Sequence, residues 1–445
     1  MKSTINKHNI QQVAKRLSDF FSMADAVAQQ TKLVQRKSRF SGAIFFKSII
    51  FGFLNNPTAS LNSLAQQSLS LGVKISPQGV HDRINHYAVD FMKAMFLHGF
   101  DQFKNKLALP LPILQQFSAI YLVDSTFKQL PASMTAQFPG TGGKASSAGL
   151  KVQLVFEFLQ GNFAQFAIES GRMADQAYTK YLDIVEAGSL VIADLGYFRL
   201  DSLKAIVEKK AFFLSRYHYT TALFWSGGEK LDIFAYLRSK RCQSQDLWVE
   251  MGASLKQRIA CRLIAVSVPP TVVEERRRKA RRRAKVMKKT YTDDYMASLA
   301  WSVFVTNIPD TLLSAEQVVL FYRIRWQIEL IFKFWKSFCG LESIPALRQE
   351  RVLTEFYAKL LIALIANYLI APLRIPDEVW SNREISPYQI RALLSLFAHH
   401  FMHAISSPRR LHRLLDLFFR NVDYFAYKQK RSARPNILSL LASLP

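Results

Sequence analysis

The stretch Val152-Gln-Leu-Val-Phe-Glu-Phe-Leu-Gln-Gly-Asn-Phe-Ala-Gln-Phe-Ala-Ile168 decides the fold. Two runs rich in β-branched and aromatic residues flank the turn Gln160-Gly-Asn162, which is typical of two antiparallel strands joined as a hairpin. Further apolar runs of strand length precede and follow this hairpin, and helical stretches separate the later ones: strands at 120–123, 190–193 and 211–214, and helices at 173–186 and 198–209. A hairpin followed by alternating strands and helices predicts an α/β fold with a mixed sheet flanked by helices.

Both ends of the chain show helical periodicity, and a segment with a different residue pattern interrupts the predicted sheet region. Residues 217–299 contain short alternating runs and a basic tract, which predicts a small β-rich insertion. Residues 301–306 are predicted to rejoin the sheet, and a long helix is predicted from 314 to 338. The expected organisation is a helical domain at 1–108, a core at 109–216 and 300–345, an insertion at 217–299, and a C-terminal helical region at 346–445.

The charge balance indicates a polyanionic partner. The chain has 59 Lys and Arg against 33 Asp and Glu, a formal net charge of +26 at pH 7, yet 49% of its residues are hydrophobic. Such a chain can fold, which excludes overall disorder, but it repels itself unless it meets a polyanion or an acidic surface.

The cysteine and histidine patterns argue against soft-metal and disulfide chemistry. Cys242, Cys261 and Cys339 are odd in number and share no short metal-ligand spacing. The nine histidines are interpreted as scattered, without a metal-binding pair. A reducing compartment follows, and the cytoplasm is expected.

We expect no membrane association. The first twenty residues carry charge but no apolar region of the kind found in signal peptides. The most apolar stretch, residues 356–373, is interrupted by Lys359, Asn367 and Pro372, so it falls short of the roughly 20 apolar residues of a membrane span. It is interpreted as a buried core helix.

Residues 60–84 have the outline of a helix-turn-helix. Residues 60–71 and 76–84 are predicted helices joined by a glycine turn, and Ser76 and Pro77 are suited to the N-cap and first position of the second helix. That helix would offer four side chains to a DNA major groove, namely Gln78, His81, Asp82 and Arg83. Two helices joined by a glycine turn also occur in any helical bundle, so both interpretations stay open.

The densest chemistry lies in Tyr322-Arg-Ile-Arg-Trp-Gln-Ile-Glu-Leu-Ile-Phe-Lys-Phe-Trp-Lys336. On a helix at 100° per residue, five of its residues fall within about 80° of one another, namely Tyr322, Arg325, Glu329, Lys333 and Lys336. The other faces are mostly apolar, so this line must meet something polar, because unpaired buried charges are costly. A cleft holding metal and phosphate fits, and an internal ladder of i,i+4 ion pairs is the alternative.

Two further carboxylates stand where a sheet would deliver them to such a cleft. Asp124 follows residues 120–123, and Asp194 follows residues 190–193. Taken singly, either could cap a turn or helix. Together with Glu329 they supply the hard oxygen ligands that two Mg²⁺ ions prefer, with Mn²⁺ as a possible substitute. Two ions about 4 Å apart could activate a water or 3′-hydroxyl for an in-line phosphodiester displacement.

The spacing Tyr322-x2-Arg325-x3-Glu329-x6-Lys336 resembles the Y-R-E-K signature of insertion-sequence DDE transposases, a family that includes hairpin-forming cut-and-paste enzymes. The likeness extends to Asp124-Ser-Thr126, to Asp194 in residues 192–198 and to the β-rich insertion, and it covers roughly residues 118–340. It implies a ribonuclease-H-like core in which Asp124, Asp194 and Glu329 are the catalytic metal ligands. It also implies that four residues hold the DNA end and its phosphates, namely Tyr322, Arg325, Lys333 and Lys336.

By this resemblance, the chain is a DNA transposase that binds the terminal inverted repeats of its element through residues 1–108. Two ends would be paired by a homodimer in a synaptic complex. Water attack would free a 3′-hydroxyl, a hairpin would form and reopen, and the strand would be transferred to target DNA on the bacterial nucleoid. The alternatives are a catalytically inactive or repurposed sequence-specific DNA-binding protein, and a structure-specific nuclease on the same core.

Trp301 and the basic tract are further candidates for DNA contact. In relatives, a tryptophan at the place of Trp301 stacks on a flipped base, whereas a strand tryptophan can equally be buried in the core. The tract at 276–289 has too many like charges to pack against protein, and we interpret it as a phosphate-tracking segment rather than a solvated arm or membrane anchor. Its arginines are Arg276, Arg277, Arg278, Arg281, Arg282 and Arg283.

Three acids near Asp194 are interpreted as structural. Asp183 is predicted to lie within a helix, and Asp201 at the beginning of one. Asp175 is predicted to be a cap or first-turn acid of the helix over 173–186.

Overall fold

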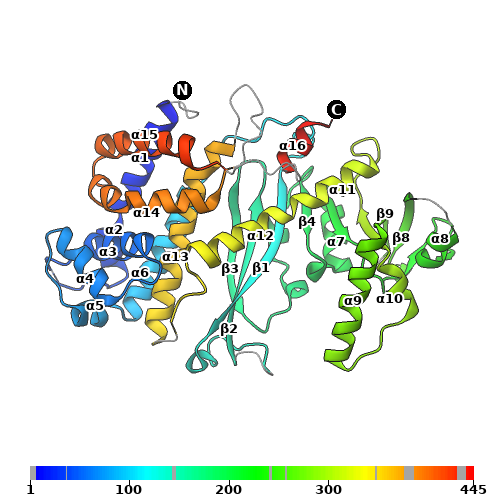
Figure 1. The fold of residues 1–445 in the computed structure, drawn as a ribbon, viewed down its shortest axis with the longest axis horizontal. Helices are drawn as coiled ribbons and strands as arrows, with labels where there is room; N and C mark the ends of the chain where they lie inside the picture. The colour runs from blue at the N-terminus through cyan, green and yellow to red at the C-terminus, as the bar shows by residue number, and fades with distance from the viewer. Residues whose placement is uncertain are drawn as a thin grey trace.

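A computed structural model of the chain describes residues 7–444 apart from 37, 143–146, 240–242, 256–257, 346–347, 375–384 and 428–436. Figure 1 shows three regions side by side: a lobe of helices, a central sheet crossed by a long helix, and the insertion at the far end.

The helical lobe combines both ends of the chain. Its first part contains α1 (Lys7–Ser22), α2 (Ala24–Gln30), α3 (Gly42–Asn55), α4 (Leu61–Ser70), α5 (Pro77–Arg83) and α6 (His86–Gln102). The C-terminal helices α14 (Pro387–Ala404) and α15 (Pro408–Phe425) pack on α3 and α1 respectively (Figure 1). The sequence showed two helical ends but no sign of this pairing, because it depends on apolar faces that each end also needs for its own packing. A short final helix, α16 (Ile437–Ala442), contacts α11 (Ala315–Ile324) of the core.

The two helices of the predicted helix-turn-helix are confirmed. Ser60 and Ser76 each cap a helix by accepting a hydrogen bond from a backbone N–H three residues on. Pro77 occupies the first turn of α5, where a missing N–H costs nothing. Local sequence chemistry therefore fixes both helix starts.

Within the described residues, ten strands form one sheet in the order β3-β2-β1-β4-β5-β10-β9-β8-β6-β7. The first five strands form the core: β1 (Ile120–Leu130), β2 (Ala148–Glu157), β3 (Asn162–Ser170), β4 (Leu190–Ala193) and β5 (Phe212–Arg216). β1, β2 and β3 are antiparallel neighbours, whereas β1, β4 and β5 are parallel. The predicted hairpin is confirmed. Gly161 at its turn has φ of +74°, a conformation that glycine adopts without strain. This mixed sheet with flanking helices is the predicted ribonuclease-H-like core.

The insertion continues the same sheet. Its strands are β6 (Leu223–Phe224), β7 (Lys230–Leu231), β8 (Ser244–Met251) and β9 (Ile259–Ser267), and its helices are α8 (Ile233–Ser239), α9 (Pro270–Met287) and α10 (Asp293–Ser298). β9 pairs with β10 (Trp301–Thr306), and β10 pairs with β5. The insertion is thus hydrogen-bonded to the core rather than attached by a linker.

The predicted helix over 173–186 is wrong. The chain instead forms two short 3₁₀ turns, at Asp175–Ala177 and Lys180–Ile184. Distant side chains take the carbonyls that an α-helix would use: Lys151 donates to Met173 O, Gln165 to Lys180 O, and Lys209 to Leu182 O. Hydrogen bonds from residues distant in the sequence therefore replace the backbone hydrogen bonds of an α-helix. The local sequence does not reveal these distant donors.

The long helix predicted over 314–338 is present in three consecutive parts. α11 (Ala315–Ile324) begins with a capping box between Ser314 and Gln317, α12 (Trp326–Lys333) follows, and a π-helical turn ends the run at Phe334–Phe338. Arg325 separates α11 from α12 but keeps helical dihedral angles, and the rod crosses the sheet over β1 (Figure 1).

α13 (Gln349–Ile370) is the predicted core helix, and α7 (Leu200–Glu208) follows β4. α13 has the length and apolarity of a membrane span, but 83% of its most apolar window is buried inside the protein. Fully buried Lys359 donates a hydrogen bond to Gly340 O and pairs with Glu355. α13 contacts α6, α3 and the π-helical turn, and it thereby joins the helical lobe to the core.

Candidate active site

Asp124 lies within β1 rather than after it, because the strand continues to Leu130. Side chains alternate across a strand, and Leu122 packs into the core cluster that contains Ile324 and Ile328 of the long helix. Val123 packs into the cluster on the opposite face. Asp124 therefore projects from the face of the sheet that the long helix covers.

Asp194 follows β4 beside Asp124. β1 and β4 are parallel, with Val123 opposite Ala193 in the register, so the two aspartates stand one position beyond the last pair. Asp194 keeps an extended backbone with φ −71° and ψ 161°, and Ile192 before it packs in the same core cluster as Leu122. The two carboxylates thus come from neighbouring strands and project toward the same face.

Glu329 lies on α12 and is linked to Asp124 by Arg325, which contacts both carboxylates. The Arg325 guanidinium lies 3.6 Å from Asp124 Oδ2 and 2.5 Å from Glu329 Oε1. Its side chain is 14% exposed, against 18% for Asp124 and 29% for Glu329. One buried cation therefore bridges a strand acid and a helix acid that are 205 residues apart in the sequence.

The carboxyl of Asp124 is poorly compensated for its burial. Its pKa is raised to about 7, because burial disfavours the charged form and the negative Asp194 and Glu329 add to the effect. The Ser125 backbone N–H, which donates to Asp124 Oδ1 at 2.8 Å, and Arg325 act in the opposite direction. Asp124, Asp194 and Glu329 therefore lie close enough for the charges of the last two to act on the first.

The donor set fits divalent cations that prefer oxygen. Asp124, Asp194 and Glu329 offer only carboxylate oxygens, which suit Mg²⁺ and Mn²⁺. As the side chains stand, no three acidic, histidine or cysteine groups of the described chain converge closely enough to hold one ion. Arg325 occupies the space between two of the three acids instead.

A second group of polar residues lies beside the aspartates and includes Asp175. This acid is in the first turn of a helical element, as predicted, although that element is a short 3₁₀ turn and its N-cap is Ala174. Its Oδ1 also accepts from Ser125 Oγ at 2.8 Å and pairs with Lys151 Nζ at 3.0 Å. Gln153 donates to the same oxygen at 3.5 Å and accepts a hydrogen bond from the Tyr197 hydroxyl. Burial raises the pKa of Tyr197 far above its usual range, so its hydroxyl stays protonated. The network links the residue after Asp124 to the turn after Asp194.

A pocket of about 500 Å³ opens beside this group. It lies next to the turn that follows Asp194 and near the outer end of β5. Its walls include an acid, an imidazole and an aromatic ring among small and apolar groups: Asp175, Leu195, Gly196, Phe198, His218 and Thr221. The pocket thus presents mixed polar and aromatic surface at the turn that begins with the residue after Asp194.

The remaining residues of the signature differ in their surroundings. The Tyr322 ring lies 5.7 Å from the Arg325 guanidinium carbon, and burial raises the pKa of Tyr322 to about 12. Lys333 is exposed. Lys336 pairs with Glu342 at 3.6 Å. The predicted polar line is therefore real in its first part, Tyr322 to Glu329, and opens to solvent at Lys333.

Trp326 was not predicted as a candidate from the sequence. This residue follows Arg325 on the long helix, and its side chain is 56% exposed. Its position between Arg325 and Glu329 adds Trp326 to the candidates for contact with a bound molecule. The only signal in the sequence was its place inside the signature, because the helix around it reads as apolar on that side.

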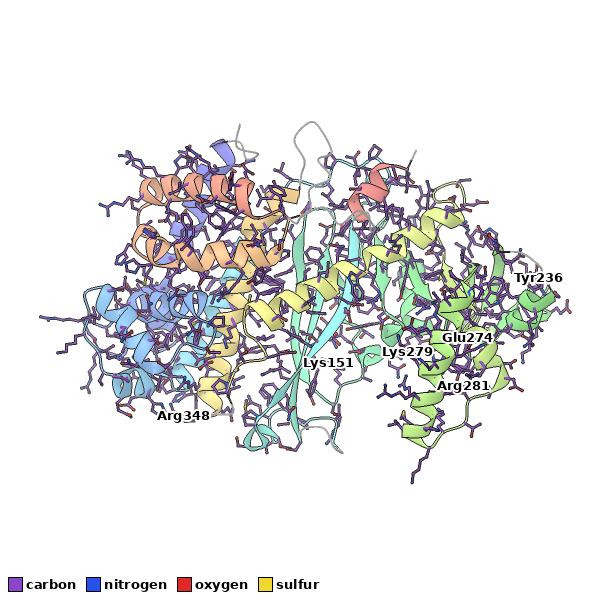
Figure 2. The ribbon with its side chains drawn as sticks, viewed as in Figure 1. Lys151, Tyr236, Glu274, Lys279, Arg281 and Arg348 are labelled. Carbon is purple, nitrogen blue, oxygen red and sulfur yellow. The ribbon has the colours of Figure 1, made fainter. Side chains whose placement is uncertain are left out.

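The basic tract is a helix, and the expectation that it cannot pack against protein is wrong for Arg276. That guanidinium donates to Leu299 O at 3.3 Å, Trp301 O at 3.1 Å and Ser302 Oγ at 3.1 Å. The carbonyls near the start of β10 need donors, and Arg276 is placed to supply them. Figure 2 shows Glu274, Lys279 and Arg281 along α9, which lies at the insertion end of the molecule. The side chains free for phosphate are the exposed ones, Arg278, Arg281, Arg282 and Arg283, while Arg277 is half-buried and pairs with Glu274.

Trp301 begins β10 and is half-buried. It packs against the core cluster that contains Val123, on the face of the sheet opposite the long helix. Its backbone carbonyl is bonded to Arg276. Both the stacking and the core interpretations of this side chain remain compatible with that position.

The structure describes the surroundings of two cysteines and of a pair of histidines. Cys261 and Cys339 are free and buried, and burial raises the pKa of each thiol to about 12, while Cys242 lies outside the described residues. The interpretation of the histidines as scattered is wrong for His399 and His403, which stand four residues apart on α14 with ring centroids 4.6 Å apart. They lie in the helical lobe, on a different part of the chain from the carboxylates.

Comparison with known proteins shows the family to which the chain belongs. The family model described as "Transposase DDE domain" matches residues 115–365. The chain is 26% identical over 453 residues to the transposase for insertion sequence element IS231B of Bacillus thuringiensis subsp. berliner, covering 94% of this chain and 92% of that protein. It is 24% identical over 451 residues to the transposase for insertion sequence element IS1151 of Clostridium perfringens, covering 96% and 95%. The chain therefore belongs to the DDE transposase family of insertion sequences, enzymes that cleave DNA and transfer strands and that use divalent metal ions.

Proposed function

We propose that this transposase cleaves the phosphodiester bonds at the ends of its own element in a reaction that depends on Mg²⁺, with Mn²⁺ as a substitute, and that Asp124, Asp194 and Glu329 hold the ions. The observation that supports the proposal is the placement of the three acids around one cation: Asp124 and Asp194 come from adjacent parallel strands in register, and Arg325 bridges Glu329 to Asp124. When bound, such ions activate an attacking water or 3′-hydroxyl and stabilise the leaving oxygen.

The protein's own groups hold the DNA. Tyr322 and Arg325 lie beside the carboxylates, and Lys333 is exposed one turn beyond Glu329. Lys336 extends the line along the same helix. Their N–H and O–H groups suit phosphate oxygens, so they position the scissile strand against the acids. The exposed arginines of α9 extend this surface along the backbone of a longer duplex.

Sequence recognition is assigned to the helical domain at 1–108. In α5, Gln78 and Asp82 are exposed and hydrogen-bonded to each other at 2.8 Å. Arg83 instead lies over the Phe40 ring at 4.8 Å, and the His81 carbonyl accepts from Arg348. The exposed edge of α5 that would enter a major groove therefore contains Gln78 and Asp82.

The synaptic complex is proposed to be a homodimer acting on double-stranded DNA ends and a target duplex at the bacterial nucleoid, in the cytoplasm. The cleaved 3′-hydroxyl is proposed to attack the opposite strand to give a hairpin before transfer to target DNA. These steps come from the likeness to hairpin-forming relatives and add chemistry that the same three acids can perform.

A cleavage assay tests the proposal. The full chain is incubated with a supercoiled plasmid carrying the inverted repeats that flank its coding sequence, with Mg²⁺, Mn²⁺ or EDTA. Asp124→Asn, Asp194→Asn and Glu329→Gln are each expected to abolish cleavage while retaining the gel shift of an end-bearing duplex. Asp201→Asn, an exposed acid at the start of α7, is the matched control and should cleave normally.

The outcomes separate the alternatives. Full cleavage by any triad variant removes that residue from the site. Retention of DNA without cleavage by the unaltered chain under either metal favours a repurposed DNA-binding protein. Cleavage without joined products favours a nuclease. Hairpin ends are detected by denaturing electrophoresis of the excised fragment.

A further inference from the structure

The guanidinium of Arg325 occupies the centre of the acidic site. It contacts Asp124 from β1 and Glu329 from α12, and no other cation of the described chain pairs with either acid. One positive charge thus stands where the proposed function requires divalent ions.

Two buried donors beside it lack acceptors. No hydrogen bond of normal geometry reaches the Nε–H of Arg325 or the hydroxyl of Tyr322, although both atoms are shielded from solvent. Leaving a buried donor unpaired is costly, and native structures rarely do so without a reason. An anionic oxygen brought against either group would supply the missing acceptor, and a DNA phosphate is the anion that this enzyme is proposed to bind.

Both observations are explained if Arg325 can exchange its carboxylate partners for a phosphate. A divalent ion at Asp124 and Glu329 and a guanidinium at the same oxygens repel each other, so the ion binds well only when Arg325 has moved. A phosphate seated at Tyr322 and Arg325 would draw the guanidinium away and release both carboxylates. The anion that Arg325 binds would then also be the signal that opens the metal site.

We propose that Arg325 is a positioning residue that couples metal loading to DNA binding: it acts as a surrogate cation in the free enzyme and leaves the carboxylates when the DNA end arrives. This inference rests on the proposed function and extends it to regulation of the same site. Coupling between two ligands is reciprocal, so metal must tighten DNA binding by the same factor by which DNA tightens metal binding. The enzyme would thereby keep its acids away from metal until an end is bound.

Metal binding in the absence of turnover tests the coupling. Free Mn²⁺ is titrated by electron paramagnetic resonance with the full chain, alone and with a pre-cleaved duplex carrying the terminal repeat that flanks the coding sequence. For the unaltered chain, we expect the duplex to tighten Mn²⁺ binding at least fivefold. Arg325→Gln should bind Mn²⁺ at least fivefold more tightly than the unaltered chain without DNA, and gain less than twofold from the duplex.

Controls keep the outcome interpretable. Arg323→Gln removes an exposed arginine from the same helix and should behave like the unaltered chain, while Arg325→Lys keeps a charge and should restore part of the coupling. Equal or weaker Mn²⁺ binding by Arg325→Gln without DNA, or undiminished coupling in that variant, overturns the inference. Should Arg325→Gln fail to fold, Arg325→Lys decides alone, and unchanged coupling in it then counts against Arg325.

The proposed function fails in a different way. Asp124→Asn should lose Mn²⁺ binding with and without DNA. Unaltered Mn²⁺ binding by Asp124→Asn would show that the ions bind elsewhere, whatever Arg325 does. The two ideas therefore have separate failures in one set of titrations.

Discussion

Asp175 accepts a hydrogen bond from the hydroxyl of Ser125, the residue that follows Asp124, at 2.8 Å. The same carboxylate oxygen pairs with Lys151, whose side chain is 13% exposed. A residue from the turn after β3 is thus hydrogen-bonded to the side chain next to Asp124, a proposed metal ligand. Groups that orient metal ligands in this way commonly change metal affinity or activity by about 10- to 100-fold when removed.

Asp175→Asn is predicted to slow cleavage roughly tenfold without abolishing it. The amide can still accept from Ser125 but cannot neutralise Lys151, so Asp124 is less firmly placed. The measurement is the cleavage rate across Mn²⁺ concentrations, where a positioning role shifts the metal dependence to higher concentration.

Asp183→Asn is the matched control, because Asp183 belongs to the neighbouring 3₁₀ turn but not to this network. Complete loss of activity in Asp175→Asn at saturating Mn²⁺ would show that Asp175 acts on the substrate or the ions directly.

The second prediction concerns pH and stability in metal-free buffer. The pKa of Asp124 is about 7 in the folded protein, against 3.8 for an ordinary aspartate. Between those values the folded chain keeps a proton that the unfolded chain has lost, so this group lowers stability as pH rises from about 4 to 7. Asp124→Asn removes that effect and is expected to raise the free energy of unfolding at pH 8 by up to about 4 kcal/mol.

Urea unfolding in EDTA at pH 5 and pH 8 gives the difference between the two proteins. The advantage of Asp124→Asn should be larger at pH 8. Mn²⁺ at a concentration that saturates the weak DNA-free site should stabilise the unaltered chain only at pH 8, because metal binding needs the charged carboxylate. An advantage that is larger at pH 5 would contradict the assigned pKa direction.

The third prediction separates two arginines of α9. Arg281 is exposed, so Arg281→Gln should weaken binding to any duplex and lower the slope of log affinity against log salt by about 1. Arg276 is bonded to the start of β10, so Arg276→Gln should lower the melting temperature instead. Filter binding from 50 to 200 mM salt and calorimetry measure the two effects. A salt slope that falls for Arg276→Gln and not for Arg281→Gln would reverse the assignment.

The fourth prediction concerns α5. Gln78→Ala removes an exposed side chain with two donors and an acceptor, and it should weaken binding to the element's own end by roughly 5- to 100-fold while leaving binding to unrelated DNA unchanged. Lys93→Ala, exposed on α6, is the control. Equal losses on specific and unrelated duplexes would indicate a phosphate contact rather than base reading.

Local chemistry explains which parts of the fold could be predicted. The hairpin at 152–168 and the helix starts at Ser60, Ser76 and Ser314 depend on short-range patterns, and all are present. The turns at 175–184 depend on donors such as Lys151 that arrive from other strands, so residue periodicity there predicted a helix that does not form.

The site shows the same division. The helical spacing of Tyr322, Arg325 and Glu329 could be read directly, because one helix sets it. The ion pair between Arg325 and Asp124 could not be predicted from the sequence, because it depends on the long helix crossing the sheet over β1. The role of Asp175 was missed for the same reason: its partners lie 24 and 50 residues away in the sequence.

Anomalous diffraction from crystals of the full chain grown with Mn²⁺ and a pre-cleaved end duplex tests the central claim most directly. The account predicts manganese peaks bounded by the carboxylates of Asp124, Asp194 and Glu329, with the Arg325 guanidinium on a DNA phosphate. Manganese bound elsewhere, with Arg325 still bridging Asp124 and Glu329 in the DNA complex, would contradict it.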